Sequence, residues 1–135
     1  MHAVPDFNHD DHRDEVVERW GESAWTKSNG WWKRLTQAER DAFLGEGVAL
    51  KNEYLEALAA GLSVSDEVVV ALVVRHRAWI AQGWGGTVPT DEQFLGLAQM
   101  YVADERFARN YGGTEGASYV RDAIVAWVAR PTESR

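Results

Sequence analysis

The sequence predicts an all-α domain, because apolar residues recur at helical spacing between helix-start and helix-end signals. The chain has 135 residues, a length that suits one domain with a single core. Hydrophobic residues make up 45% and charged residues 26% of the sequence, which argues against wholesale disorder. We therefore expect one domain over residues 1–135, with five main helices in a core over 36–130 and one or two short helices in an N-terminal segment over 1–35.

The N-terminal segment is predicted to hold two short helices. The first extends from about Asp10 to Trp20, where Gly21 ends it, and its acidic start suits the helix dipole. The second lies within residues 22–34, and the turn-forming run 28–30 is expected to end it. Both helices are too short and too polar to be stable alone, so their order must come from packing on the rest of the chain.

The first long helix begins at a capping box over residues 36–39, where Thr and Glu satisfy each other's backbone groups. It is expected to span 37–60, with Gly61 as its C-cap. Gly45 and Gly47 weaken this helix, and they either admit a close neighbour or mark a kink. The helix is predicted to carry one apolar stripe, formed by Leu44, Val48, Leu55, Leu58 and Leu62.

The next segment contains a run of valines over 68–74 that alone would fit a buried strand. The apolar pattern continues at helical spacing to Ile80, however, so we expect a helix over 66–82. Residues 83–89 are predicted to form a loop, because three glycines and a proline cannot continue a helix.

Three further helices are expected after this loop. A second capping box over 90–93 begins a helix that runs to about Ala103. Asp104 is expected to open a short helix that ends at the glycine pair 112–113. The last helix spans about 115–129 and stops before the final proline.

The composition argues against several classes of function. The formal net charge is −7, from 14 basic and 21 acidic residues, so direct nucleic-acid binding is not expected. The absence of cysteine excludes disulfides, thiolate metal sites and thiol nucleophiles. No apolar run approaches the roughly 20 residues of a membrane span and no signal peptide is visible, so we expect a cytoplasmic protein. Common enzyme motifs are absent, and we expect neither catalysis nor a cofactor.

Seven tryptophans are more than a core of this size needs, and indole rings suit a site that holds a flat organic ligand. His76, Trp79 and Trp84 lie in or just after one predicted helix, with His76 and Trp79 on the same face. They form either a pocket wall, in which the imidazole bonds a polar ligand group, or a core in which the histidine bonds a backbone carbonyl. The spacing of these residues leaves both interpretations open.

A second group of candidate ligand-binding residues lies where the later helices meet. Asp104 either accepts hydrogen bonds from ligand N–H groups or caps the helix that follows, and the two roles are compatible. A methionine in this group would adapt to an irregular ligand. The group consists of Met100, Tyr101, Asp104, Phe107 and Tyr111.

The N-terminal tryptophans either fasten a weak segment to the core or belong to a mobile lid over residues 1–35 that folds over a ligand. Coupled ordering costs roughly 2–5 kcal/mol of gross binding energy. Each ring that becomes buried gives about 4–6 kcal/mol as an upper bound, so three or four rings would still leave the roughly 8 kcal/mol that micromolar binding needs. The lid residues expected to contact ligand are Trp20, Trp25 and Trp32.

A metal site is conceivable only near the N-terminus. His9 and His12 are three residues apart and would share a helix face. No further histidine or cysteine stands near them, the stretch is terminal, and a solvated helix start accounts for it better. We expect no metal site.

These segments together resemble the TipAS type of antibiotic-recognition domain. The resemblance rests on Met-Tyr-Val-Ala-Asp-Glu-Arg-Phe over 100–107 and on Glu-Arg-Trp-Gly over 18–21, with support from 76–77 and 122–124. TipAS domains form the ligand-sensing half of some MerR-like transcription regulators and also occur without a DNA-binding half. The resemblance implies a globin-like arrangement of helices and an N-terminal segment that becomes ordered on ligand binding.

The chain departs from this family in the loop before Thr90. The member that gives the family its name captures thiopeptide antibiotics covalently through a cysteine in this loop. Here residues 86–89 read Gly-Thr-Val-Pro, and the stretch around Trp84 looks longer and richer in glycine. The resemblance therefore implies noncovalent, reversible binding.

We expect the protein to bind a bulky aromatic or peptidic antibiotic or a similar natural product, for sensing or for sequestration. It would act as the effector domain of a regulator or as a stand-alone drug-binding resistance protein, and as a monomer or weak homodimer. One alternative is a globin-like haem or tetrapyrrole protein with His76 as axial ligand. The other is a protein–protein interaction domain whose exposed indoles meet a partner.

Overall fold

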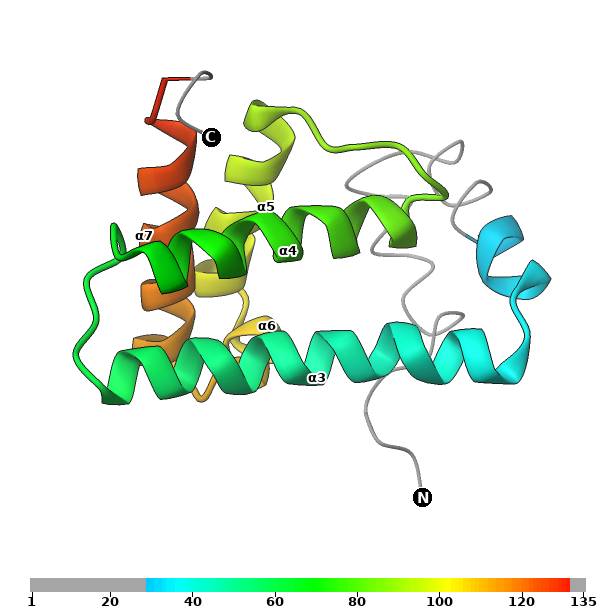
Figure 1. The fold of residues 1–135 in the computed structure, drawn as a ribbon, viewed down its shortest axis with the longest axis horizontal. Coiled ribbons are helices and arrows are strands. Elements are labelled where there is room, and N and C mark those ends of the chain that lie inside the picture. The colour runs from blue at the N-terminus through cyan, green and yellow to red at the C-terminus, as the bar shows by residue number, and fades with distance from the viewer. Residues whose placement is uncertain (1–28, 132–135) are drawn as a thin grey trace. The chain divides into compact units, whose positions relative to one another are not determined.

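The computed structural model describes residues 29–131, which form helices joined by short turns and loops, with no strand among them (Figure 1). The predicted all-α fold class is confirmed. None of these helices combines the length and the apolar character that a membrane crossing requires. The elements are a helical stretch over 29–34, followed by α3 (Gln37–Ala59), α4 (Glu67–Gly83), α5 (Asp91–Ala103), α6 (Glu105–Asn110) and α7 (Thr114–Val128).

The predicted starts of α3 and α5 are confirmed by their capping hydrogen bonds. Oγ1 of Thr36 accepts from the backbone N–H of Glu39 at 3.1 Å, and the backbone N–H of Thr36 donates to Oε1 of Glu39 at 2.8 Å. Thr90 and Gln93 form the same reciprocal pair of bonds at the start of α5. Such bonds satisfy donors that the first helical turn leaves unpaired, which is why the sequence locates these boundaries well.

The predicted stop at residues 28–30 is wrong, because residues 29–34 are helical. The backbone N–H of Leu35 still bonds the carbonyl of Trp32 at 3.2 Å, so the helical stretch ends there. The rings of Trp31 and Trp32 both pack on Phe43, and their centroids lie 4.9 Å and 6.2 Å from the centroid of the Phe43 ring. Packing of two indoles therefore outweighs the turn propensity of Asn and Gly.

The predicted apolar stripe of α3 is displaced from the face that is buried. Its predicted members are only half-buried, namely Leu44, Val48, Leu55, Leu58 and, after the helix end, Leu62. The buried residues of α3 are Phe43, Leu50, Tyr54 and Ala57. The search for a stripe of aliphatic residues missed the buried face, because the residues of that face are mainly aromatic or small. In α4, by contrast, the predicted helix correctly buries one side of the valine run, with Val69 and Val73 buried and Val68 exposed.

The described chain divides into two compact units. Among the described residues, the first unit holds 29–48 together with Ala78–Val88, and the second unit holds Ala49–Arg77 and 89–131. In the second unit, α5 packs against α7, and α6 packs against both (Figure 1). The chain is able to turn sharply between α6 and α7 because Gly112 and Gly113 adopt φ values of +78° and +98°.

Candidate functional site

The second unit buries a histidine between two tyrosine hydroxyls. His76 lies on α4 and is only 1% exposed. Its Nδ1 atom lies 3.0 Å from the hydroxyl of Tyr54 on α3, and its Nε2 atom lies 3.1 Å from the hydroxyl of Tyr101 on α5. Both ring nitrogens of His76 therefore bond side-chain hydroxyls, and not the backbone carbonyl that we considered from the sequence.

Burial keeps these polar rings neutral near pH 7. Loss of hydration lowers the pKa of His76 to about 3. The same cause raises the pKa of Tyr54 and of Tyr101 well above their ordinary value, and it raises the pKa of Tyr111 to about 12. A neutral imidazole donates one hydrogen bond and accepts one, which matches the two partners of His76.

Aromatic rings surround His76 closely. Tyr101 stacks on the imidazole, with ring centroids 5.7 Å apart and an interplanar angle of 8°. Phe94 meets the imidazole edge-on at 5.8 Å, and Tyr111 packs on Tyr101 at 5.1 Å. We call this set, with Tyr54, the His76 ring cluster. Its members fill the space around the histidine, so in the described structure His76 belongs to a packed core.

Asp104 stands at the junction between α5 and α6. Its Oδ1 atom accepts from the backbone N–H of Arg106 at 3.0 Å, and its Oδ2 atom pairs with Nη2 of Arg106 at 2.9 Å. The predicted capping role of Asp104 is thereby confirmed, while a ligand contact stays a prediction. Nearby, Met100 is buried and the half-buried ring of Phe107 lies 6.2 Å from that of Tyr101.

The first unit has an aromatic group of its own. The indole N–H of Trp79 donates to the backbone carbonyl of Phe43 at 2.8 Å, and the two rings stack with centroids 4.8 Å apart and an interplanar angle of 14°. Trp31 and Trp32 pack on Phe43 from the helical stretch that precedes α3. Phe43 is buried, whereas the three indoles are half-buried. This group, which we call the indole group, therefore presents flat apolar rings at the surface of its unit.

The remaining candidates are placed as follows. Trp84 is half-buried in the turn after α4, where its backbone N–H bonds the carbonyl of Ile80 at 3.0 Å. Trp20 and Trp25 lie outside the described residues, as do His9 and His12. Within residues 29–131, no cluster of three or more potential ligand side chains is arranged to hold a metal ion.

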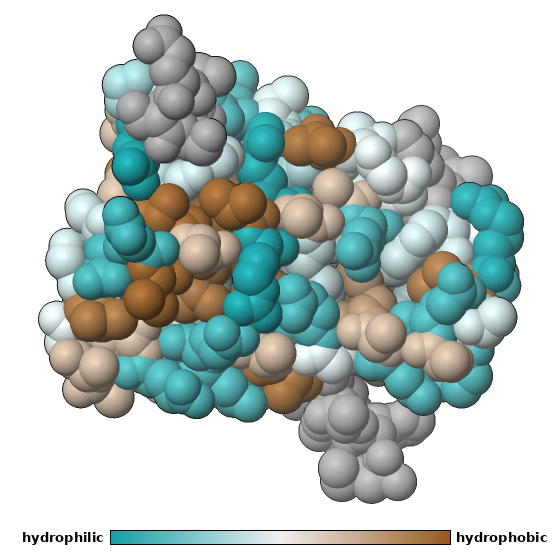
Figure 2. Space-filling model, viewed as in Figure 1, coloured by the Kyte–Doolittle hydropathy of each residue, from teal (hydrophilic) through white to brown (hydrophobic). Residues whose placement is uncertain are grey.

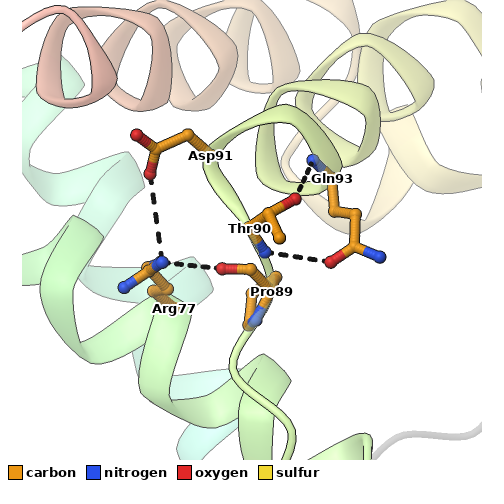
Figure 3. Close-up of polar contacts among 5 residues, drawn as sticks. All are labelled: Arg77, Pro89, Thr90, Asp91 and Gln93. Atoms are coloured by element: carbon orange, nitrogen blue, oxygen red, sulfur yellow. Dashed lines mark hydrogen bonds and ion pairs between the residues drawn. The ribbon is translucent and has the colours of Figure 1, made fainter.

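Sequence reasoning did not predict the role of Arg77, which holds the start of α5 (Figure 3). Its Nη2 atom donates to the carbonyl of Pro89 at 2.7 Å and lies 3.9 Å from Oδ1 of Asp91. Its guanidinium also lies over the ring of Trp127, 5.3 Å from the centroid. No local motif could have shown these contacts, because the partners stand 12 or more residues away. Tyr54 and Phe43 were missed for the same reason.

The surface of the second unit carries an apolar area. Figure 2 shows apolar side chains gathered over the beginning of α4 and along α7. Val68 is 57% exposed and Val125 is 41% exposed. An open hollow of about 210 Å³ lies beside them, and it is lined by Val64, Ser65, Val70, Ala126, Trp127 and Arg130.

Residues 12–127 match the sequence model of the TipAS antibiotic-recognition domain. The HTH-type transcriptional activator TipA of Streptomyces coelicolor is 32% identical over 130 residues, a match that covers 94% of this chain and 51% of TipA. The HTH-type transcriptional regulator SkgA of Caulobacter vibrioides is 29% identical over 103 residues, covering 74% of this chain and 40% of SkgA. The chain thus spans about half the length of the curated relatives it matches.

A solved structure of TipAS from Streptomyces lividans in complex with nosiheptide also matches this fold. The TM-score is 0.77 at 32% sequence identity, and the match covers 94% of this chain and 90% of that chain. That structure belongs to a thiopeptide antibiotic multidrug resistance system. The resemblance to TipAS domains and the globin-like, all-α fold class that it implied are both confirmed.

Proposed function

Because the chain belongs to the family of TipAS antibiotic-recognition domains, we propose that it binds a bulky aromatic or peptidic antibiotic without forming a covalent bond to it. The observation that carries this proposal is the match over residues 12–127, which contains every candidate ligand-binding residue. The TipAS relative with a similar fold was solved with nosiheptide, a thiopeptide, so a thiopeptide is the first ligand to test.

The absence of cysteine supports the noncovalent part of the proposal. The chain has no cysteine at any position, so no thiol is available to attack an electrophilic antibiotic. In the loop before Thr90, the exposed side chains are those of Thr87 and Val88. An unactivated threonine hydroxyl is a poor nucleophile and valine is none, so we expect a bound antibiotic to dissociate unchanged.

The indole group supports an aromatic ligand. Trp31, Trp32 and Trp79 are half-buried, so each retains ring surface that a flat ligand would cover. Indoles held by packing lose little side-chain freedom when they bind, which favours affinity. We propose Trp32 and Trp79 as contacts in the first unit, and the half-buried Phe107 and Tyr111 as contacts in the second unit. The predicted lid and its residues Trp20 and Trp25 remain part of the proposal.

The haem alternative gains no support from the surroundings of His76. Both of its ring nitrogens hydrogen-bond tyrosine hydroxyls within the packed His76 ring cluster. Ligation of iron would break one of these bonds and would require space that aromatic rings occupy. A protein–protein interaction domain is favoured by a different observation, the exposed valines of α4 and α7.

Titration of the full chain with nosiheptide, followed by tryptophan fluorescence, tests the proposal. We expect a saturable change in emission, and a Trp32→Ala variant that binds about tenfold more weakly, in line with the effect of losing one central aromatic contact. A Val125→Thr variant is the matched control, and its affinity should equal that of the parent. If Val125→Thr instead changes elution in gel filtration and nosiheptide does not alter emission, the interaction-domain alternative is favoured.

The biological use of such binding is also a proposal. TipA and SkgA are HTH-type transcription regulators, and this chain matches about half of each. We propose that binding serves either as the sensing step of a regulator or as sequestration of the antibiotic. Expression of the chain in an antibiotic-sensitive host distinguishes these uses, because sequestration raises the tolerated nosiheptide concentration without any DNA-binding partner.

A further inference from the structure

Arg40 of α3 lies against the indole group, where Trp32 holds its side chain. The Nε atom of Arg40 donates to the backbone carbonyl of Trp32 at 3.1 Å. The guanidinium also lies over the Trp32 ring, with Cζ 5.3 Å from the ring centroid, a distance typical of a cation–π contact. Because the guanidinium is both bonded and stacked, its orientation is fixed before any ligand binds, and little freedom is left to lose.

Most of the hydrogen-bonding capacity of Arg40 is unused among residues 29–131. A guanidinium carries five N–H donors, and the bond to Trp32 uses the one on Nε. The four N–H groups on Nη1 and Nη2 have no acceptor in this part of the chain. The side chain of Arg40 is only half-buried, so it retains surface that a ligand would contact.

The acidic residues next to Arg40 are engaged elsewhere. Oε1 of Glu39 accepts from the backbone N–H of Thr36 at 2.8 Å, and Oδ1 of Asp41 accepts from Nε2 of Gln37 at 2.9 Å. Within the described part of the chain, neither carboxylate forms an ion pair with Arg40. Arg40 differs in this respect from four other arginines that do lie within ion-pair distance of a carboxylate, namely Arg75, Arg77, Arg106 and Arg121.

The stretch around Arg40 is basic although the chain is acidic. Residues 29–40 hold three basic side chains and one acidic side chain, whereas the whole chain has a formal net charge of −7. An acidic protein repels anions in general, so a site for an anion must depend on a local cation. Of the three basic residues, Lys33 and Arg34 are exposed, and Arg40 is the one that packs on an indole.

We propose that Arg40 and the indole group bind a planar aromatic acid. The carboxylate of the ligand accepts hydrogen bonds from Nη1 and Nη2 of Arg40, and its flat ring covers the half-buried indoles of the same unit. The guanidinium fork matches a carboxylate in bidentate geometry. The inference rests on the proposed antibiotic-binding function, because it names the chemical class of the bound compound as one that carries a carboxylate beside an aromatic ring system.

A matched pair of small probes tests this class in the parent protein. Naphthalene-2-carboxylate and naphthalene-2-carboxamide share one ring system, but only the carboxylate is anionic at pH 7. In ¹H–¹⁵N spectra of the full chain, we expect the acid to bind about tenfold more tightly than the amide, in line with hydrogen bonds to a charged group. Indole N–H signals should shift with both probes, and added salt should weaken only the binding of the acid.

Replacement of Arg40 tests whether the preference comes from this side chain. Arg40→Gln should bind the acid and the amide equally, and an unchanged affinity for the amide will show that the indole group is intact. Arg40→Lys should keep a smaller preference, because lysine retains the charge but not the fork. Arg34→Gln is the matched control, since it removes the same charge from an exposed side chain whose Nη1 atom lies beside Gly30. This variant should retain the full preference.

The outcomes separate this inference from the proposed function. The carboxylate site is overturned if the parent does not bind the acid, if it binds acid and amide equally, or if the full preference survives in Arg40→Gln. Nosiheptide binding by the parent in any of these cases leaves the proposed function intact. A preference for the acid that Arg40→Gln abolishes supports the site, even where nosiheptide does not bind and recognition of a peptidic antibiotic is thereby contradicted.

Discussion

Trp79 lies against the backbone of α3 at Gly47. A Cβ atom built on Gly47 would stand 2.7 Å from Cζ2 of the Trp79 ring, closer than real side chains approach. The indole N–H of Trp79 bonds the carbonyl of Phe43, one helical turn before Gly47. The close neighbour that the sequence allowed for at this glycine is therefore Trp79. The absence of a side chain at Gly47 leaves the space that the Trp79 ring occupies in the indole group.

Replacing Gly47 with alanine should destabilise the protein. Alanine gains up to about 1 kcal/mol of helix propensity, but the overlap with the Trp79 ring should cost about 1–3 kcal/mol, so the net change is unfavourable. Urea unfolding gives the free energy, and tryptophan emission shows whether the indole has moved. Gly45 is the matched control, because a Cβ there meets nothing within 4 Å. Gly45→Ala should be stabilising, and equal effects at both positions would refute the role of Trp79.

The buried imidazole should make the protein sensitive to mild acid. The pKa of His76 is about 3 in the folded protein, below its ordinary value of 6.5. Between these two values the unfolded chain binds a proton that the folded protein does not, so stability falls as the pH falls from about 6.5 toward 3. The slope from this group is at most about 1.4 kcal/mol per pH unit.

Urea unfolding of the parent and of His76→Gln at pH 7.0, 5.5 and 4.5 measures this slope. The variant should be less stable at pH 7, because it loses hydrogen bonds to Tyr54 and Tyr101. The difference in stability between the two proteins should shrink as the pH falls, since only the parent carries the imidazole. A difference that stays constant over this range would contradict the assignment of a neutral, buried His76.

Loss of the Arg77 side chain should loosen the start of α5. Arg77→Ala removes the bond to the carbonyl of Pro89 and the contact with the ring of Trp127, which should cost about 1–3 kcal/mol. Arg77→Lys keeps the charge but not the planar fork, so an intermediate loss is expected. Thermal unfolding measures both. Arg121 is the control, because it pairs with its exposed neighbour Asp122, and Arg121→Ala should change the stability by less than about 0.5 kcal/mol.

A cysteine placed in the loop before α5 should convert reversible binding into covalent capture. Val88 is 53% exposed in this loop, so a thiol introduced by Val88→Cys would be accessible to a ligand. Intact-protein mass spectrometry under denaturing conditions should show a nosiheptide adduct on this variant and none on the parent. Val125→Cys, at a 41% exposed position on α7, is the matched control. Equal adduct formation by both variants would mean that the thiol reacts without specific binding.

Local signals in the sequence were sufficient to predict the helices, but not the side-chain contacts of the His76 ring cluster and the indole group. The capping boxes at Thr36 and Thr90 involve residues three apart, and the structure contains both. The bond between Tyr54 and His76 joins residues 22 apart, and that between Phe43 and Trp79 joins residues 36 apart. Such contacts depend on how helices pack, and no spacing rule within one helix predicts them.

The two predictions that the structure corrects, the helix stop at residues 28–30 and the buried face of α3, failed because packing between distant residues decided the outcome. The turn signal at Asn29-Gly30 is overridden because Trp31 and Trp32 gain more by packing on Phe43 than the backbone loses in a helix. The buried face of α3 contains Tyr54, which a count of aliphatic residues leaves out. The capping role of Asp104 could be predicted, because its bond with the backbone N–H of Arg106 joins residues two apart. A contact between Asp104 and a ligand could not be predicted in this way, because it does not depend on neighbouring residues.

Isothermal titration calorimetry of the full chain with nosiheptide, followed by mass spectrometry of the recovered protein, tests antibiotic recognition most directly. We predict saturable heat with one ligand per chain, a dissociation constant in the micromolar range or tighter, and a protein mass that is unchanged afterwards. Absence of binding heat at ligand concentrations well above this range, or a protein that gains the mass of the antibiotic, would contradict noncovalent recognition.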